Sequence, residues 1–367
     1  MERGMYMRHK EAVIIGAGPA GLKAAKSLCE AGASVTIIDR NKDLGGQLTK
    51  QTHKFFGSEK QYASVRGIEI LKILLNDLLE YGTQCEILNE TSVVGLYHDK
   101  VIACVKDDKF FKIKAESIII ATGASEKSIP FENNDLPGIY AAGAVQTLMN
   151  QYGVKPGDKV LMVGSGNIGL IVSYQLMQAG VEVVKLVEAA PSISGYLVHA
   201  SKIQRLGVDI LTQTSIKRAI GKEQVEKVEL WNLDETWQGM EGSEQTLEVD
   251  TVCISVGLAP LTELLMQVGA EVMYIRELGG NVPKIDHRYQ TTVKGVYACG
   301  DVCGIEEASS AMVEGALSGI HAAFDLGYTI DDEKRKVKAL KEELKFLRSG
   351  PHAAKIRAGY NKLGVMI

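Results

Sequence analysis

Short, mainly apolar runs mark the buried strands of this chain. Four of them are Ala12–Ile15, Val35–Ile38, Val160–Val163 and Val183–Val187. A strand with one face in water alternates apolar and polar residues, whereas a parallel strand that is covered on both faces does not. The pattern therefore predicts an α/β fold in which these runs are buried parallel strands.

A glycine pattern follows the first run of each pair and opens a helix. It reads Gly16-Ala-Gly18-Pro-Ala-Gly21 in one place and Gly164-Ser-Gly166-Asn-Ile-Gly169 in the other. The first glycine makes a tight turn, the second lets the backbone approach a pyrophosphate, and the third lets helix and strand pack closely. Because the helix N-terminus offers free N–H groups to an anion, the chain predicts two dinucleotide-binding sites.

An acidic residue ends the second run of each pair. Asp39 stands 23 residues after Gly16, and Glu188 stands 24 residues after Gly164. A carboxylate at this place accepts hydrogen bonds from ribose hydroxyls and repels a 2′-phosphate. No arginine occurs in residues 189–191 to offset that repulsion, so the second site is expected to favour NAD over NADP.

Between the two patterns, the spacing predicts a helix over residues 60–81 and then a strand meander. The apolar face expected for the helix consists of Ile68, Leu71, Leu75, Leu78 and Leu79. The meander is entered by Val93–Leu96 and Val101–Val105, and the chain then returns in a buried strand, Ser117–Ala121.

The second half repeats this order, which indicates an internal repeat. Its further strands are expected at Val208–Leu211, Gln224–Trp231 and Thr251–Val256, and the last of them ends at Gly257. The chain then returns to the first domain through a strand, Gly295–Ala298, and a helix over about 306–326.

This order predicts two Rossmann-like dinucleotide-binding domains, each with three layers (ββα), the second inserted in the first. The expected boundaries are 1–125 and 258–330 for the first domain, 126–257 for the second, and 331–367 for a C-terminal helical tail. Within the tail, Lys and Glu at helical spacing predict a solvated amphipathic helix over 332–347. The apolar residues 363–367 could cover a partner surface.

Composition narrows the classes of function. The chain has 367 residues, 46% of them apolar, and 41 basic against 45 acidic residues, so neither nucleic acid nor an anionic membrane is indicated as the main partner. The apolar runs are far shorter than a membrane span, and residues 1–10 lack the apolar core of a signal peptide. We therefore expect a cytoplasmic protein.

The six cysteines are scattered, and no CxxC motif is present. Most fall in strand or helix patterns, where a buried free thiol is the ordinary explanation. Cys299 and Cys303 straddle the turn Gly300-Asp301, but their spacing fits no zinc or iron–sulfur pattern, so no metal site is predicted.

Together, the two glycine patterns, Ala121-Thr122-Gly123 and Gly300-Asp301 resemble the pyridine-nucleotide/FAD oxidoreductases over residues 11–330. The resemblance implies FAD at the first site, with Asp39 on the adenosine ribose and Gly300-Asp301 at the ribityl and phosphate region, and NAD(H) at the second. The implied FAD residues are Gly16, Gly18, Pro19, Ala20, Asp39, Arg40, Gly46, Gln47, Thr122, Gly123, Gly300, Asp301 and Ala311. The implied NAD residues are Gly164, Gly166, Asn167, Ile168, Glu188 and Gly257.

A narrower similarity lies in residues 133–146 and 301–312. These segments look like the subunit of dye-linked proline dehydrogenases, opine oxidases and hydrogen cyanide synthases that works beside an amine-oxidising flavoprotein subunit. Many such subunits carry a C-terminal cysteine cluster for an iron–sulfur centre, whereas no cysteine follows Cys303 here. Either a small iron–sulfur protein carries that cluster, or electrons take another route; a hetero-oligomer is expected.

Relatives that reduce disulfides place a cysteine pair after a glycine pair in the first domain, or a CxxC in the second. Here Gln47 follows Gly45-Gly46, so the flavin is expected to exchange electrons directly. Lys50 and His53 are the titratable residues nearest the expected flavin. Lys50 would supply a charge that stabilises reduced flavin, and His53 would relay a proton. Both could instead be solvent-facing loop residues.

Three functions remain open at this point. The first is an electron-transfer subunit of an amine or imino-acid (proline-like) dehydrogenase that uses FAD and NAD(H). The second is a free-standing NADH:acceptor reductase for a ferredoxin, rubredoxin or quinone. The third is a non-catalytic subunit whose second domain binds ADP or ATP.

Overall fold

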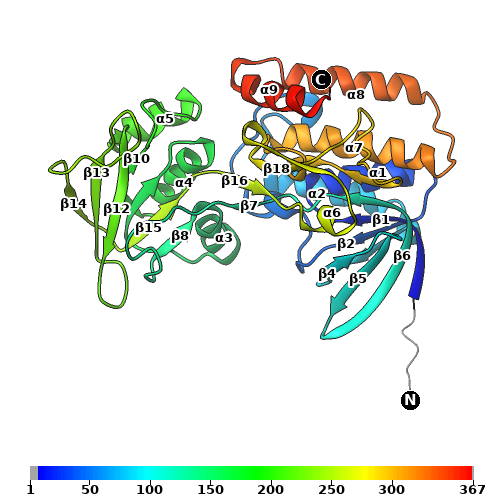
Figure 1. The fold of residues 1–367 in the computed structure, drawn as a ribbon, viewed down its shortest axis with the longest axis horizontal. Coiled ribbons are helices and arrows are strands. Elements are labelled where there is room, and N and C mark those ends of the chain that lie inside the picture. The colour runs from blue at the N-terminus through cyan, green and yellow to red at the C-terminus, as the bar shows by residue number, and fades with distance from the viewer. Residues whose placement is uncertain (1–6, 366–367) are drawn as a thin grey trace. The chain divides into compact units, whose positions relative to one another are not determined.

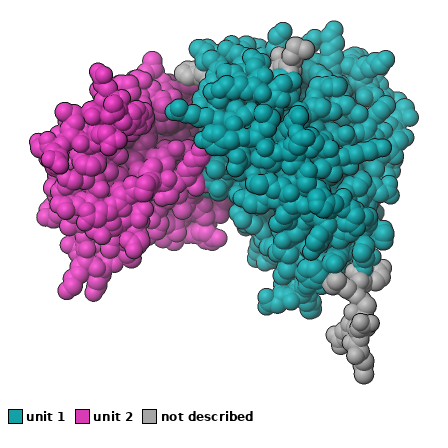
Figure 2. All heavy atoms as spheres, in the orientation of Figure 1, with its two compact units in different colours: residues 1–125, 259–367 teal, residues 126–258 magenta. Residues whose placement is uncertain are grey.

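The computed structural model describes residues 7–365, apart from the side chain of His352. The chain forms two compact units, one of residues 1–125 and 259–367 and one of residues 126–258 (Figure 2). Along the chain, the second unit is thus inserted between the two segments of the first.

A mixed sheet forms the centre of the first unit (Figure 1). Its strands in spatial order are β3 (Cys85–Leu88), β2 (Val35–Ile38), β1 (Met7–Ile15), β6 (Lys109–Ile120), β5 (Val101–Lys106) and β4 (Ser92–Leu96), and β19 (Val296–Ala298) also pairs with β6. The pairings β3-β2-β1-β6 and β6-β19 are parallel, whereas β4, β5 and β6 form an antiparallel meander. Ile15 lies opposite both Ile38 and Ile120, so three parallel strands end at one edge.

Both faces of β1 are buried, which explains its apolar run. Val13 packs on one face in a core cluster with Ile102 of the meander, and Ile14 packs on the other face in a cluster with Leu22. Because neighbouring side chains of a strand point to opposite faces, every position from 12 to 15 must be apolar.

Three helices pack together on the helical face of this sheet. They are α1 (Pro19–Glu30), α2 (Gly67–Leu79) and α7 (Ala308–Asp325). Two glycines of α7 allow it to approach α1 closely: an added Cβ would lie 2.0 Å from the carbonyl oxygen of Ala20 at Gly315, and 2.5 Å from that of Ala24 at Gly319. The small residues of this helix are therefore a packing requirement.

The helix predicted over 60–81 is shorter than expected. Residues 59–61 form a 3-10 turn, Tyr62 and Ser64 have positive φ angles of 63° and 69°, and the α-helix begins only at Gly67. Its buried residues are Gly67, Ile70, Leu74 and Leu78. The predicted face was thus partly wrong: Leu79 is 72% exposed, because the leucines are spread around the helix and packing against α1 selects one side.

The meander also differs from the prediction in one respect. The expected return strand Ser117–Ala121 is the last part of a single long strand, β6, whose first part pairs with β5.

The remaining elements of the first unit follow the inserted second unit. They are α6 (Glu263–Gln267), a hairpin of β17 (Val272–Ile275) and β18 (Gly280–Pro283), α8 (Glu333–Leu347) and α9 (Ala354–Leu363), with 3-10 turns η4 (Arg276–Leu278), η5 (Gly300–Val302) and η6 (Pro351–Ala353). Three further 3-10 turns precede the second unit: η1 (Gly46–Lys50), η2 (Glu59–Gln61) and η3 (Gly82–Gln84).

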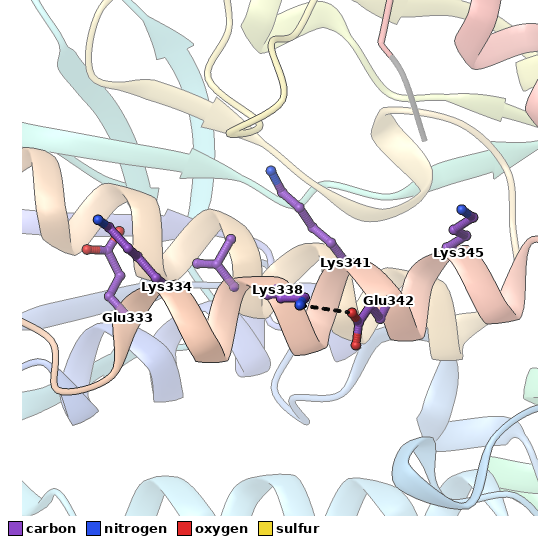
Figure 3. Close-up of a pocket in the computed structure, with 7 residues that line it drawn as sticks. Glu333, Lys334, Lys338, Lys341, Glu342 and Lys345 are labelled. Carbon is purple, nitrogen blue, oxygen red and sulfur yellow. Dashed lines mark ion pairs between the residues drawn. The ribbon is translucent and has the colours of Figure 1, made fainter.

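The helix predicted over 332–347 is confirmed as α8. Val337, Leu340 and Leu344 pack on the core of the first unit. Most charged residues of the helix are exposed, among them Lys338 and Glu342, which form an ion pair (Figure 3), whereas Glu343 is buried. Of the apolar residues 363–367, Leu363 is buried in the same core, and residues 366 and 367 lie outside the described part. Leu363 therefore packs within its own unit.

The second unit is built in the same way. A parallel sheet has the order β11 (Ile210–Leu211), β10 (Glu182–Val187), β9 (Lys159–Val163), β15 (Thr251–Ile254) and β8 (Ile139–Ala141). Its helices are α3 (Ala142–Tyr152), α4 (Asn167–Gln178) and α5 (Leu197–Arg205). An antiparallel sheet of β12 (Thr214–Ile220), β13 (Lys227–Asn232) and β14 (Gln245–Glu248) forms the third layer, and β7 (Ala124–Glu126) pairs with β16 (Leu258–Pro260).

The residues of β9 divide between two cores, as those of β1 do. Met162 packs with the helices, whereas Leu161 packs with the antiparallel strands.

β12 and β14 were not predicted, because their polar and apolar residues alternate only briefly. The predicted class, two three-layer Rossmann-like domains with the second inserted in the first, is confirmed. No helix in the described residues has the length and apolar character needed to cross a membrane.

Candidate functional site: two glycine turns at helix N-termini

The first glycine turn holds three chain segments as close as their backbones permit. Gly16 has a φ of 105°, and a Cβ there would lie 2.2 Å from the carbonyl oxygen of Ala121 at the end of β6. A Cβ at Gly21 would lie 1.9 Å from the carbonyl oxygen of Gly16. The first and third glycines are therefore required by close packing.

Gly18 is different, because an added Cβ would meet no atom within 4 Å. It precedes α1, which begins at Pro19, and its own backbone is extended, with a φ of −73°. The space beside it is open, and the first N–H groups of the helix point toward it. An anion such as a pyrophosphate fits this place.

Asp39 fixes the same turn from β2. Its carboxylate is 8% exposed; Oδ2 accepts a hydrogen bond of 2.8 Å from the N–H of Ala17, and Oδ1 accepts one of 2.8 Å from the N–H of Asn41. Each oxygen retains acceptor capacity for a ribose hydroxyl.

The fold brings further predicted residues to this turn from distant parts of the chain. A Cβ at Gly46 would lie 3.1 Å from the Cα of Gly18, and a Cβ at Gly300 would lie 2.9 Å from that of Ala20 and 3.5 Å from that of Ala311. Five of the predicted residues thus surround the N-terminus of α1.

At the end of β6, the Thr122 hydroxyl donates to the carbonyl oxygen of Leu261, and the carbonyl oxygen of Gly123 accepts from the N–H of Leu261. Gly123 has a φ of 72° with open space where a Cβ would stand. A bound ligand can therefore approach the backbone here.

Four further predicted residues, Arg40, Gln47, Lys50 and His53, lie in the segment between β2 and α2. Arg40 and Gln47 are exposed. Lys50 ends the 3-10 turn η1 and is half-buried, and the ring of His53 stacks on that of Phe55 with centroids 5.9 Å apart. The roles of Lys50 and His53 stay predictions.

The second glycine turn repeats the first in its backbone. Gly164 has a φ of 105°, and a Cβ there would lie 2.1 Å from the carbonyl oxygen of Ser255, while one at Gly169 would lie 2.2 Å from that of Gly164. Glu188 takes the place of Asp39: Oε2 accepts from the N–H of Ser165 at 3.0 Å, and Oε1 accepts from the N–H of Ala190 at 3.0 Å.

The carboxylate of Glu188 accepts more hydrogen bonds from the protein than that of Asp39, however. Its Oε2 also accepts a short hydrogen bond from the Ser165 hydroxyl and a longer one, 3.4 Å, from the Ser194 hydroxyl. Since a carboxylate oxygen has about two acceptor sites, little capacity remains on Oε2, and a ribose hydroxyl must be accepted by Oε1.

A loop of the second unit also lies against the N-terminus of α4. The side chain of Asn167 accepts from the N–H of Tyr196 at 2.8 Å, and a Cβ at Gly195 would lie 3.0 Å from the nitrogen of Asn167. Ile168 is 39% exposed, and Gly257 is exposed after β15. The second turn is thus partly covered by its own chain, whereas the space at Gly18 is open.

Comparison with known proteins identifies the family to which this chain belongs. The family model for pyridine nucleotide-disulphide oxidoreductases matches residues 10–315, which is most of the chain. The protein belongs to this family. A subunit of the opine oxidase of Agrobacterium tumefaciens (strain Ach5) is 24% identical over 86% of this chain, and the match spans 65% of that subunit's length.

Two solved structures share the fold. L-proline dehydrogenase from P. horikoshii has a TM-score of 0.69 and 24% identity, covering 92% of this chain and 60% of that one. T. acidophilum thioredoxin reductase has a TM-score of 0.70 and 23% identity, covering 87% and 99%. The family resemblance drawn from the motifs is confirmed, and so is the prediction of FAD and a nicotinamide nucleotide as its cofactors.

The first turn of this pyridine nucleotide-disulphide oxidoreductase fits FAD on structural grounds. Open space at Gly18, a helix N-terminus and a buried carboxylate are what an adenine dinucleotide requires. Asp301, on the turn η5, is half-buried, and desolvation by the surrounding protein raises its pKa to about 7; its Oδ1 accepts a weak hydrogen bond from the N–H of Glu306 at 3.5 Å. A ligand hydroxyl would complete its hydrogen bonding.

Two glutamates near the turns were not singled out from the sequence. Glu314 of α7 is 2% exposed, and its Oε2 accepts from the N–H of Gly300 at 2.8 Å. Glu126 accepts from the N–H of Gly143 at the start of α3, at 2.6 Å. The signal for Glu314 was a carboxylate in the middle of a mainly small and apolar helix, where an unpaired charge is costly.

All six cysteines are free thiols; Cys85 is half-buried and the other five are buried. Burial raises the pKa of the thiols of Cys299 and Cys303, which flank η5. Both thiols are therefore protonated at neutral pH and are poor nucleophiles.

Proposed function

We propose that this FAD and NAD(P) oxidoreductase is the electron-transfer subunit of a hetero-oligomeric amine or imino-acid dehydrogenase. In this function it passes electrons between bound FAD and NAD(H) without a redox disulfide. The whole assembly's substrate is oxidised on another chain.

The observation that carries the proposal is the loop after the glycine pair. Where disulfide-reducing relatives have a cysteine pair, this chain has Gln47 and Leu48, and the cysteines that flank η5 are fully buried. At the two places where disulfide-reducing relatives carry a thiol relay, this chain therefore lacks the residues for one. The similarity to part of an opine oxidase supports an assembly that acts on carbon–nitrogen bonds.

In this proposal, bound FAD supplies the hydride chemistry. The residues around Gly18 bind its pyrophosphate through the helix N-terminus, and Asp39 accepts from its ribose. Asp301 accepts from the ribityl chain when ionised and donates when protonated, since its raised pKa of about 7 allows both states near neutral pH. In the second unit, Gly166 and Glu188 bind the pyrophosphate and ribose of NAD(H).

The purified chain tests the nicotinamide half of the proposal. Under anaerobic conditions, NADH is expected to bleach the flavin absorbance, and a dye acceptor is expected to give turnover. The same measurement with NADPH should show much slower reduction, because of Glu188. A flavin-loaded protein that NADH never reduces contradicts the proposal.

A second experiment tests the subunit role. The chain is tagged in its own cells, and the proteins that co-elute at constant ratio are identified by mass spectrometry. The proposal requires an amine-oxidase-type flavoprotein among them, and substrate-driven dye reduction by that complex. A single chain with full NADH:ferredoxin, rubredoxin or quinone turnover would favour the free-standing reductase instead.

A third function, nucleotide binding without hydride transfer, would use the same turn. Glu188 accepts hydrogen bonds from Ser165 and Ser194 and keeps capacity on Oε1 for a ribose hydroxyl, and ADP and ATP carry that ribose as NAD does. Denaturing the purified protein and analysing the released nucleotides decides this: ADP or ATP, together with an absence of NADH reduction, would support that function.

A further inference from the structure

A buried ionic cluster lies directly behind the turn η5. Arg348, which follows α8, is 2% exposed, and its Nε donates to Oε2 of Glu306 at 2.9 Å. Its terminal nitrogen also bonds Glu306 and Glu314, and its guanidinium lies 4.3 Å from the centroid of the Tyr360 ring. One cation from the C-terminal segment therefore bridges two carboxylates.

Both carboxylate residues are in turn connected to the turn η5. Oε2 of Glu314 accepts from the N–H of Gly300 at 2.8 Å, and the N–H of Glu306 approaches Oδ1 of Asp301 at 3.5 Å. Oε1 of Glu314 accepts from the Tyr360 hydroxyl at 2.8 Å. Gly300 is thus bonded to a side chain that Arg348 holds, and Asp301 is approached by the backbone of a second residue whose side chain Arg348 holds.

The charge balance of the cluster depends on the same residue. The groups that face it are Glu306, Glu314, Tyr289 and Tyr360, and the acids that act on Asp301 are Glu306, Glu307 and Glu314. Arg348 is the cation among these groups. A buried carboxylate that loses its cation either stays charged at high cost or takes up a proton, and both change its hydrogen bonds.

We propose that Arg348 is a positioning residue of the flavin site: by neutralising Glu306 and Glu314 it holds the turn Gly300-Asp301 in the conformation that binds FAD. Through it, the C-terminal segment after α7 becomes part of the flavin site. This inference rests on the proposed binding of FAD to the first unit.

The test is the FAD affinity of the apoprotein, measured by titration with quenching of flavin fluorescence, beside the unfolding temperature. Arg348→Met should weaken FAD binding at least tenfold. The loss should grow as the pH rises, because Glu314 then ionises without a cation. Adding Glu314→Gln to Arg348→Met should recover most of the affinity, since the amide oxygen still accepts from Gly300 without a charge.

The matched control is Arg288→Met. It removes another ion pair of α7, that of Arg288 with Asp325 at 2.6 Å, whose other hydrogen-bond partners are His321, Gln290 and Tyr297. Its unfolding temperature should fall, but its FAD affinity should equal that of the wild type.

Several outcomes would overturn the inference. They are an unchanged affinity in folded Arg348→Met, an equal loss in Arg288→Met, or no recovery in the double variant. If Arg348→Met does not fold, Arg348→Lys takes its place: the shorter lysine keeps the charge but lacks the Nε donor to Glu306, so at least threefold weaker binding is required, and unchanged binding contradicts the inference. If the wild type itself binds no FAD, the proposed function fails instead.

Discussion

The N–H of Ala17 donates to the carboxylate of Asp39 across 2.8 Å, and this bond connects the first glycine turn to the end of the neighbouring strand. The second unit repeats it between Ser165 and Glu188. In both units the acid expected to bind ribose also accepts a hydrogen bond from the glycine turn. One carboxylate therefore stabilises the turn and is expected to bind the ligand.

Replacing Asp39 should therefore reduce both stability and FAD affinity. Asp39→Ala leaves the buried N–H of Ala17 without its acceptor, which costs about 1–3 kcal/mol of unfolding free energy. Asp39→Asn keeps one acceptor oxygen and should cost less. Urea denaturation and FAD titration measure the two effects, and Asp43→Asn, an exposed acid of the same loop, is expected to leave both within error.

Gly18 offers a change that should separate binding from folding. Gly18→Ala meets no atom within 4 Å and keeps a negative φ, so the apoprotein should unfold within about 0.5 kcal/mol of the wild type. The new methyl group occupies the space expected for the pyrophosphate, so FAD affinity should fall at least tenfold.

Gly16→Ala is the matched contrast. Its Cβ would lie 2.2 Å from the carbonyl oxygen of Ala121, at a φ of 105°. This variant should therefore be less stable than the wild type even without a ligand. Thermal unfolding of the two apoproteins measures the difference, and equal stability of the two variants would contradict this role of the turn.

Glu188 should govern the choice between NADH and NADPH. Glu188→Gln removes the negative charge and keeps an acceptor for the N–H of Ser165. We expect the preference for NADH to fall by about tenfold, equivalent to about 1.4 kcal/mol, through tighter NADPH binding. The ratio of the two dissociation constants measures this. An unchanged ratio would mean that Glu188 only stabilises the loop to which it is hydrogen-bonded and does not select the nucleotide.

Acid should destabilise the first unit through His321. Burial is the largest cause that lowers its pKa, to about 4, while the unfolded imidazole has its ordinary value of 6.5. Between these values the unfolded state binds a proton that the folded state does not, so stability falls as the pH decreases from 6.5 to 4, by up to about 3 kcal/mol.

His321→Gln should remove this part of the pH dependence. Asp301 acts in the opposite direction, because its pKa is raised to about 7 and the folded state binds the extra proton as the pH falls. The difference between variant and wild type in urea unfolding, followed across this pH range, isolates His321. His287→Gln, at an exposed site, should behave like the wild type.

The helix after residue 60 shows where the sequence was insufficient. Its leucines occupy several sides, so periodicity alone did not select Ile70 and Leu74 as the buried pair. Two left-handed residues, Tyr62 and Ser64, delay its start to Gly67. Neither side chain indicates a left-handed backbone, so the delay was not visible in the sequence.

The sequence by itself determined the two glycine turns, their strands and the acid that follows each. These features arise from local requirements: only glycine permits the positive φ of Gly16 and the close approach at Gly21, and only apolar runs fill strands covered on both faces. Such requirements act within one βαβ unit, so they are written in consecutive residues.

Only the tertiary structure decided which distant residues complete the site. Gly46, Gly300 and Ala311 reach the start of α1 from separate segments, and Arg348 joins them through Glu314 from nearly 50 residues beyond η5. The physical reason is that a buried carboxylate must find a cation wherever the fold supplies one, and the position of that cation along the chain follows no local rule.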